Sequence, residues 1–191
     1  MSISKGIYII DDFLSDFLLN SFLKDDSEFI EQPMKGKSFW VRVPSEQFVK
    51  YVIEKIEKIE NQKIVNLLSF FREAKKNQDD DWRIHNDSII LGQQPDRAIV
   101  LFMESKESAE LNGTAFWEHK IHGDVYNGYG NDDFDKILKE ESEKLESWNL
   151  KSVVGYKQNR LLSYPCRYFH SKYPKEFNDP RRVFVMFYKY K

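Results

Sequence analysis

The chain has 191 residues, of which 41% are hydrophobic and 31% charged, a length suited to one domain with a substantial core. A net charge of −2 excludes a generally basic, nucleic-acid-binding surface. A single cysteine, Cys166, excludes an internal disulfide framework and a multi-cysteine zinc site. The longest apolar stretch near the N-terminus, Ile7 to Ile10, is too short for a signal peptide or a membrane span. We therefore expect a cytoplasmic protein with no membrane partner.

The first sixty residues predict one strand and two helices. Residues 6–10 are β-branched and aromatic and are followed by two aspartates, which is typical of a short buried strand. Ser15 is a good N-cap for a first helix. Its buried stripe would consist of Phe17, Leu18 and Phe22. The second helix follows Ser45 and should stop at Asn61. Its apolar residues recur every three or four positions, at Val49, Val52, Ile53, Ile56 and Ile59.

The remainder of the chain is mostly β in pattern. Residues 64–71 form an apolar run of strand length, and the polar segment 75–81 is expected to be a solvated connection. Further strands are predicted at 98–103, 114–117, 161–164 and 183–188, with a turn at Asn112-Gly113. Residues 132–148 are charge-rich with helical periodicity and are interpreted as an inserted helix. The fold class is therefore α+β, mainly β: an antiparallel double sheet with N-terminal supporting helices and one helical insertion.

Two histidines and an aspartate form a candidate metal site. His85 and Asp87 are two residues apart, so in an extended segment both side chains point to the same face. His170 follows a predicted strand and the turn at Pro165. Two histidines and one carboxylate, with three coordination positions left open, make the facial triad of non-haem Fe(II) oxygenases.

A cation for an anionic co-substrate is expected on the last strand. Arg182 follows His170 at a distance that suits one turn and an adjacent antiparallel strand. Arginine binds a carboxylate with two parallel hydrogen bonds. Arg181 lies beside it, and strand alternation favours Arg182, which should share a face with Phe184 and Met186.

With these motifs in this order, the sequence resembles the Fe(II)/2-oxoglutarate-dependent dioxygenase superfamily, in particular its prolyl-4-hydroxylase-like branch. Matching elements run nearly from end to end. Residues 9–15 (IIDDFLS) are similar to the usual entry of that branch, and residues 85–87 (HND) match its HxD motif. Residues 159–162 (NRLL) with 169–171 (FHS) match the distal-histidine region, and residues 182–187 (RVFVMF) match the closing strand.

The resemblance implies a single double-stranded β-helix domain (jelly roll, cupin-like) over residues 1–191. Residues 1–80 would supply the N-terminal strand and helices, and residues 81–191 the jelly-roll core with the helical insertion at 132–148. It also implies that His85, Asp87 and His170 bind Fe(II). Arg182 would bind the distal carboxylate of 2-oxoglutarate, with Arg181 and Arg160 as weaker candidates.

The reaction implied by the resemblance uses O₂ and 2-oxoglutarate to hydroxylate a substrate C–H bond, giving succinate and CO₂, with ascorbate as a supporting reductant. A tyrosine commonly helps to hold 2-oxoglutarate in this branch, and the sequence does not choose among the tyrosines. The substrate class is also open: an unidentified peptide or small molecule is expected, whereas nucleic acid is not favoured.

Several alternatives stay open beside this hypothesis. His119 and His122 are a rival metal pair, although Gly113 and Gly123 argue against the helix that such a pair needs. We expect them, together with Trp117, on the substrate side of the site. A nucleobase-directed oxygenase would need a basic groove beside the iron. A jelly-roll binding or assembly protein without catalysis is the alternative from another functional class.

Overall fold

The computed structural model describes residues 6–34, 37–79, 81–105, 112–126, 139–173 and 180–191. Among them, seven strands form a larger sheet in which all neighbours are antiparallel. Its order is β1 (Tyr8–Ile10), β8 (Leu161–Pro165), β5 (Arg97–Ser105), β10 (Arg181–Tyr190), β4 (Ile64–Ala74), β3 (Lys37–Arg42) and β2 (Ile30–Met34).

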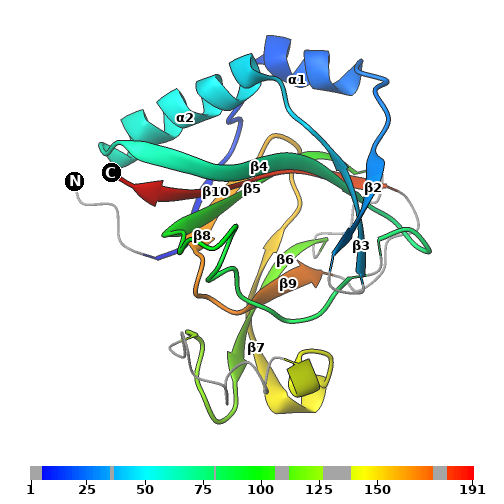
Figure 1. Cartoon of the computed structure of the whole chain (residues 1–191), viewed down its shortest axis with the longest axis vertical. Helices are drawn as coiled ribbons and strands as arrows, with labels where there is room; N and C mark the ends of the chain where they lie inside the picture. The colour runs from blue at the N-terminus through cyan, green and yellow to red at the C-terminus, as the bar shows by residue number, and fades with distance from the viewer. Residues whose placement is uncertain (1–5, 35–36, 80, 106–111, 127–138, 174–179) are drawn as a thin grey trace.

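A smaller antiparallel sheet lies against the larger one (Figure 1). Its order is β7 (Trp148–Gly155), β6 (Gly113–His119) and β9 (His170–Tyr173). His85 forms an isolated antiparallel bridge with His170, so the segment around residue 85 extends this sheet beside β9. The two facing sheets make the double-stranded β-helix expected from the sequence, and that fold prediction is confirmed.

Two helices cover the outer face of the larger sheet (Figure 1). The helix α1 (Asp16–Leu23) begins after Ser15, whose Oγ accepts a hydrogen bond from the Leu18 amide at 3.4 Å. The helix α2 (Glu46–Glu60) begins after Ser45 in the same way and ends at Asn61 in the left-handed conformation, with φ 52°. Both helix starts and the stop at Asn61 are confirmed. Phe17 is 79% exposed, so its assignment to the buried stripe is wrong.

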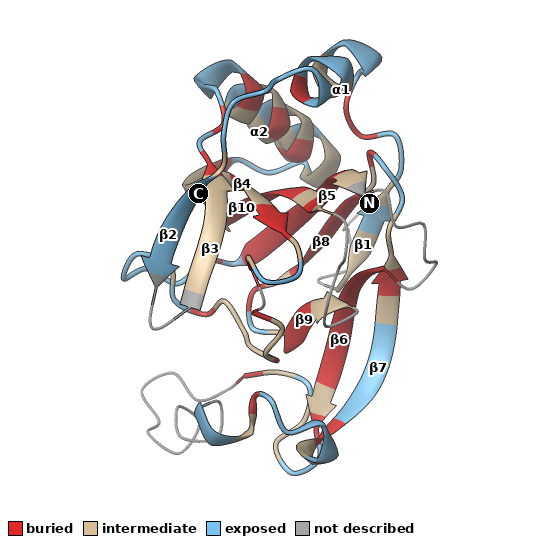
Figure 2. Ribbon diagram, turned by 90° about the vertical axis from the view of Figure 1, so that its right-hand side faces the viewer, coloured by how far each residue is buried: buried red, intermediate tan, exposed pale blue. Residues whose placement is uncertain are grey.

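The side chains of β10 alternate between two buried layers. Phe184, Met186 and Tyr188 pack on the helix side, whereas Val183, Val185 and Phe187 lie between the sheets. Figure 2 shows the central strands buried over most of their length. A third cluster, which includes Ile84, Ala115, Trp117 and Phe169, lies on the outer face of the smaller sheet. The space between the sheets is therefore bounded by buried strands on both sides.

The structure corrects the predicted organisation in two places. β4 pairs with β10 in the centre of the larger sheet, so it belongs to the jelly roll and not to an N-terminal supporting segment. Trp148 begins strand β7 after the short 3-10 helix η1 (Leu145–Ser147), so the predicted helix does not continue to residue 148. The part of that prediction that covers residues 132–138 lies outside the described residues.

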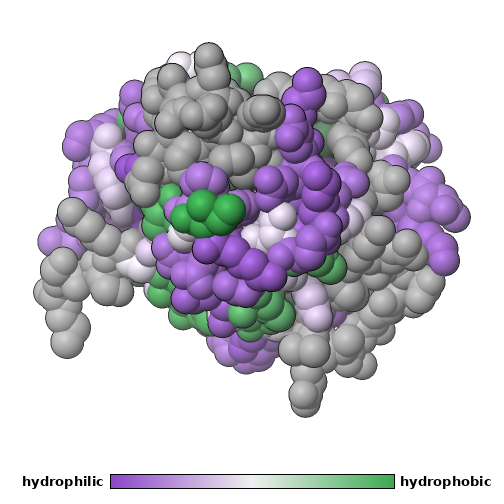
Figure 3. Space-filling view, turned by 90° about the horizontal axis from the view of Figure 1, so that it is seen from below, coloured by the Kyte–Doolittle hydropathy of each residue, from purple (hydrophilic) through white to green (hydrophobic). Residues whose placement is uncertain are grey.

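The face of the molecule opposite the helices is largely hydrophilic where described residues are drawn, with hydrophobic atoms in small separate patches (Figure 3). No helix in the described part of the chain is both long enough and apolar enough to cross a membrane.

Candidate metal centre

The structure brings His85 and Asp87 together with His170, which lies far from them in sequence. Potential ligand atoms of His85, Asp87 and His170 all lie within 4.8 Å of one another. The Asp87 carboxylate lies 3.1 Å from Nε2 of His170 and 3.8 Å from Nε2 of His85. The centroids of the two imidazole rings are 4.4 Å apart. The predicted grouping of these side chains on one face is therefore present.

Backbone hydrogen bonds hold the two ligand segments side by side. The amide of His85 donates to the carbonyl of His170 at 3.0 Å, and the amide of His170 donates back at 2.8 Å. The amide of Asp87 donates to the carbonyl of Cys166 at 2.8 Å. Backbone hydrogen bonds thus anchor both sides of the site and orient the three side chains.

The outer nitrogens of both imidazoles are engaged by the backbone. Nδ1 of His85 lies 2.9 Å from the carbonyl oxygen of Arg83, and Nδ1 of His170 lies 3.0 Å from that of Tyr168. A carbonyl oxygen only accepts, so each Nδ1 carries a hydrogen, and each Nε2 is left as the nitrogen that can bind a metal through its lone pair. Metal-binding histidines are oriented in this way by their outer hydrogen bonds.

The electrostatics favour the protonation states that a divalent metal requires. Burial, reinforced by the neighbouring His170, lowers the pKa of His85 to about 4. Burial alone would raise the pKa of Asp87, but the two imidazoles and Arg72 hold it below its ordinary value. At neutral pH the site therefore has a neutral His85 and an ionised Asp87. This donor set fits Fe(II) with several coordination positions free for other ligands.

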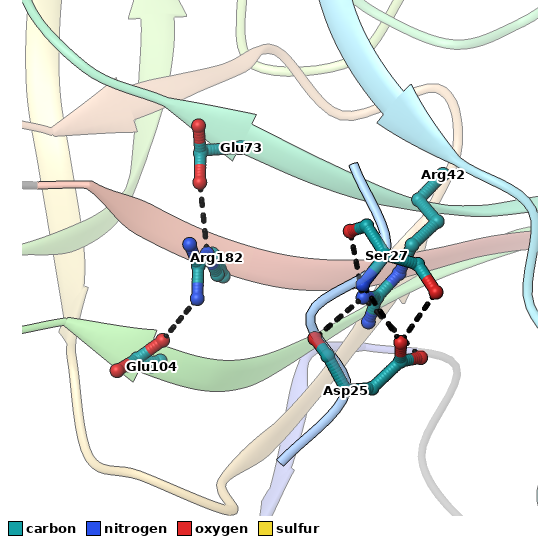
Figure 4. A network of polar contacts seen from close by, with 6 residues as sticks. All are labelled: Asp25, Ser27, Arg42, Glu73, Glu104 and Arg182. Carbon is teal, nitrogen blue, oxygen red and sulfur yellow. Dashed lines mark hydrogen bonds and ion pairs between the residues drawn. The ribbon is translucent and has the colours of Figure 1, made fainter. Parts of the chain in front are cut away.

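Arg182 does not face this site, and the prediction that it does is wrong. It shares a face with Phe184 and Met186 as expected, but that face is the one covered by the helices. Its Nε donates to Glu73 at 2.8 Å and its Nη1 to Glu104 at 2.7 Å (Figure 4). A β-bulge between Arg182 and Val183 in the pairing with β5 brings Glu104 onto the same face.

Arg181 lies on the opposite face of β10, between the sheets. Its side chain is 5% exposed, its Nη2 donates to the carbonyl of Gly113 at 3.2 Å, and its guanidinium lies 5.2 Å from the ring centre of Phe102. Burial, together with the neighbouring Arg72, lowers its pKa to about 9, which still leaves it charged at neutral pH. Arg181 is therefore the arginine of this pair that shares the interior with the candidate ligands.

Arg160 has a structural environment. Its guanidinium donates to both carboxylate oxygens of Asp11, at 2.6 and 3.1 Å, and to the carbonyl of Gly155 at 2.9 Å. These contacts tie the segment after β1 to the start of β8. They do not direct Arg160 toward the histidine–aspartate group.

Trp117, His119 and His122 are also separated from the candidate ligands. Trp117 belongs to the cluster on the outer face of the smaller sheet, where its indole nitrogen donates to Ser171 at 2.9 Å. Nε2 of His119 lies 3.1 Å from Glu141, and its Nδ1 accepts from the amides of residues 121 and 122. His122 stacks against His119, with ring centres 4.8 Å apart. These contacts hold the three residues apart from the histidine–aspartate group, and their expected place on the substrate side stays a prediction.

Four residues near the site carry polar groups that the sequence analysis did not single out. They are Arg72, Asp79, Tyr164 and Lys172. Asp79 is 1% exposed and accepts two hydrogen bonds from Arg72, at 2.5 and 2.6 Å, so the segment 75–81 is not simply solvated. The ring of Tyr164 lies 4.7 Å from that of His170, centre to centre. Burial raises the pKa of Tyr164 well above its ordinary value, so its hydroxyl stays protonated.

Comparison with solved structures shows that this fold is shared. The chain aligns over 97% of its length with HygX from Streptomyces hygroscopicus, solved with nickel and 2-oxoglutarate, at 12% identity, 83% coverage of that chain and a TM-score of 0.59. It aligns over 97% with the 2-oxoglutarate complex of the viral collagen prolyl hydroxylase vCPH from Paramecium Bursaria Chlorella virus-1, at 11% identity, 96% coverage and a TM-score of 0.57.

A third similar structure is the non-heme alpha-ketoglutarate-dependent carbocyclase SnoK from nogalamycin biosynthesis. It aligns with 96% of this chain and 79% of its own, at 10% identity and a TM-score of 0.63. No family model matches the chain. A search of curated proteins likewise gives no sequence match. The predicted resemblance to 2-oxoglutarate oxygenases is thus confirmed at the level of the fold.

Proposed function

We propose that this chain is an Fe(II)- and 2-oxoglutarate-dependent oxygenase that hydroxylates a substrate C–H bond. The observation that carries the proposal is the convergence of His85, Asp87 and His170, with both Nδ1 atoms engaged by backbone carbonyls. Bound there, Fe(II) would supply the redox chemistry by which O₂ converts 2-oxoglutarate to succinate and CO₂ while one oxygen atom enters the substrate.

Arg181 is the residue we assign to the distal carboxylate of 2-oxoglutarate. It is buried between the sheets, on the face of β10 that also carries Val183 and Val185. A buried guanidinium is a strong partner for a carboxylate, because charge-assisted hydrogen bonds strengthen where water is excluded. Tyr164, whose ring lies beside that of His170 and whose hydroxyl stays protonated, is our candidate for the tyrosine that helps to orient the co-substrate.

We place the substrate among peptides and small molecules. Structures with this fold include a collagen prolyl hydroxylase and HygX in a complex that also contains hygromycin B. The fold is therefore compatible with a protein target and with a bound small molecule.

The experiment is Fe(II)-dependent conversion of 2-oxoglutarate to succinate by the purified chain. Wild type should form succinate with Fe(II) and O₂ and should stop when the metal is chelated. Asp87→Ala should abolish turnover, since it removes one of three ligands, whereas His122→Ala, a histidine outside the site, should retain it. Full turnover by Asp87→Ala would refute the proposed function. Metal binding without any effect of 2-oxoglutarate would favour a jelly-roll binding or assembly protein instead.

A further inference from the structure

Lys172 points into the space between the sheets beside His170. The two residues are next-but-one neighbours on β9, so their side chains share a face, and their Cα atoms are about 7 Å apart for an ordinary strand rise. Their partners on β6 are Phe116 for His170 and Thr114 for Lys172. The Lys172 side chain is only 5% exposed. A buried ammonium group therefore belongs to the next side chain on the same face of β9 as the candidate metal ligand His170.

Arg181 reaches the same region from the opposite sheet. Its guanidinium donates to the carbonyl of Gly113, the residue that precedes Thr114 on β6 and pairs with Tyr173 on β9. Thr114 is the direct partner of Lys172. The cation from the larger sheet and the cation from the smaller sheet thus converge on one short stretch of β6.

Asp79 holds Lys172 in this position. Nζ of Lys172 donates to the backbone carbonyl of Asp79 at 2.6 Å and lies 3.8 Å from its carboxylate. That carboxylate already accepts two hydrogen bonds from Arg72. The contact with Asp79 therefore orients Lys172 mainly through the backbone carbonyl, because the carboxylate is hydrogen-bonded to Arg72.

Positive charge exceeds negative charge among the described residues of this region. Arg72, Arg181 and Lys172 are cations, and Arg83 lies 3.2 Å from Asp81. Asp79 and Asp81 face them, and the carboxylate of Asp87 also interacts with Arg72, so four cations are set against three carboxylates. Buried cations of like sign repel one another in a medium of low dielectric constant, so this arrangement favours binding of an anion.

Building on the function proposed above, we propose that Lys172 is a second cation for the distal carboxylate of 2-oxoglutarate, beside Arg181. The spacing of about 7 Å between His170 and Lys172 along the strand suits a five-carbon acid whose 2-oxo end lies at the metal. An ammonium has three donors, so its bond to Asp79 is compatible with an anionic ligand. Lys172 thereby selects a dianionic 2-oxo acid over a monoanionic one of equal length.

The test is calorimetric titration of the Mn(II)-loaded protein with 2-oxoglutarate and with 2-oxopentanoate, which has the same carbon chain without the distal carboxylate. Lys172→Met should weaken 2-oxoglutarate binding about 10- to 100-fold, as expected for loss of a charge-assisted hydrogen bond. Binding of Mn(II) and of 2-oxopentanoate should change by less than about twofold. Lys172→Arg should keep most of the preference for the dianion. Lys151→Met, a half-exposed lysine on β7, should behave as wild type.

Two results would overturn the role of Lys172. One is wild-type affinity of Lys172→Met for 2-oxoglutarate, and the other is an equal loss of affinity for both acids, which a purely structural lysine would give. Lys172→Gln, whose amide can still donate to the Asp79 carbonyl, provides a second variant should the methionine protein not fold. In Lys172→Gln as well, the affinity for 2-oxoglutarate relative to that for 2-oxopentanoate must fall.

Failure of the proposed function itself would look different. Wild-type Mn(II) protein would not bind 2-oxoglutarate, or Arg181→Met would bind it as tightly as wild type. Loss of affinity in Arg181→Met with none in Lys172→Met would refute the inference alone.

Discussion

Replacing Asp79 by Asn should destabilise the protein strongly, because its carboxylate is a buried partner of a buried arginine. The side chain of Asp79 is fully buried and that of Arg72 is 19% exposed, and two hydrogen bonds of 2.5 and 2.6 Å join them. Removing one partner of a buried ion pair costs about 3–5 kcal/mol. Arg72 keeps some access to water and stacks on Phe39 at 4.6 Å, so we expect the lower end, about 3 kcal/mol.

For a domain of this length, such a loss corresponds to a fall in Tm of roughly 6–12 °C. Urea unfolding followed by circular dichroism measures it directly. A double variant with apolar residues at both positions, Arg72→Met with Asp79→Leu, should recover at least half of the loss. Neither member of the pair is then left as an unpaired charge, and Lys172 keeps its hydrogen bond to the backbone carbonyl of residue 79. Glu54→Gln is the matched control. It breaks an exposed pair with Lys50 at 3.9 Å and should change stability by less than about 0.5 kcal/mol. If Asp79→Asn also lost less than about 0.5 kcal/mol, the reasoning about the buried ion pair would be refuted.

Three further predictions concern the glycine of β6, the pH dependence and a helix cap. Gly113→Ala would drive a Cβ into the carbonyl oxygen of Val154, so it should lower the free energy of unfolding in urea by more than about 2 kcal/mol. An unchanged stability would contradict the close approach of β6 and β7. His85 has a pKa of about 4 in the folded chain and an ordinary value of 6.5 when unfolded, so the unfolded chain takes up its proton first as the pH falls. The stabilisation that comes from keeping His85 neutral in the metal-free protein should therefore be complete above pH 6.5 and be lost as the pH falls toward 4. Denaturation at a series of pH values measures this, and an unchanged slope in His85→Gln would exclude His85 as the cause. Ser45→Ala should cost about 1 kcal/mol by removing the N-cap of α2, and Tm should fall accordingly; an unchanged Tm would argue against the cap.

The helix starts and the shared face of His85 and Asp87 were predictable because each depends on short-range pattern, whereas the jelly-roll fold and the place of His170 beside this pair followed from the resemblance in motif order. The two-residue spacing of His85 and Asp87 places both side chains on one face of an extended segment whatever the rest of the fold does. Ser15 and Ser45 mark helix starts through local hydrogen bonds. The strands β2, β3, β7 and β9 were not predicted. β2 and β9 have only five and four residues, and β7 has polar residues between its apolar ones, which weakens the apolar signal. In β3 the apolar run is only three residues long.

The choice between Arg181 and Arg182 shows what strand alternation cannot predict. Alternation placed Arg182 correctly on the face of Phe184 and Met186. Both faces of β10 are apolar, however, because one packs against helices and the other against the smaller sheet. Sequence alone could not tell which face contains the site. Lys172, in contrast, carried a usable signal, since the spacing argument that joined His85 to Asp87 also joins His170 to Lys172.

The most direct test of the central claim is a crystal structure of the chain with Mn(II) and an unreactive analogue of 2-oxoglutarate. We expect one Mn(II) bonded to Nε2 of His85, Nε2 of His170 and a carboxylate oxygen of Asp87. The distal carboxylate of the analogue should meet the guanidinium of Arg181. A metal bound elsewhere, or an analogue bound on the Arg182 side of the larger sheet, would contradict the account.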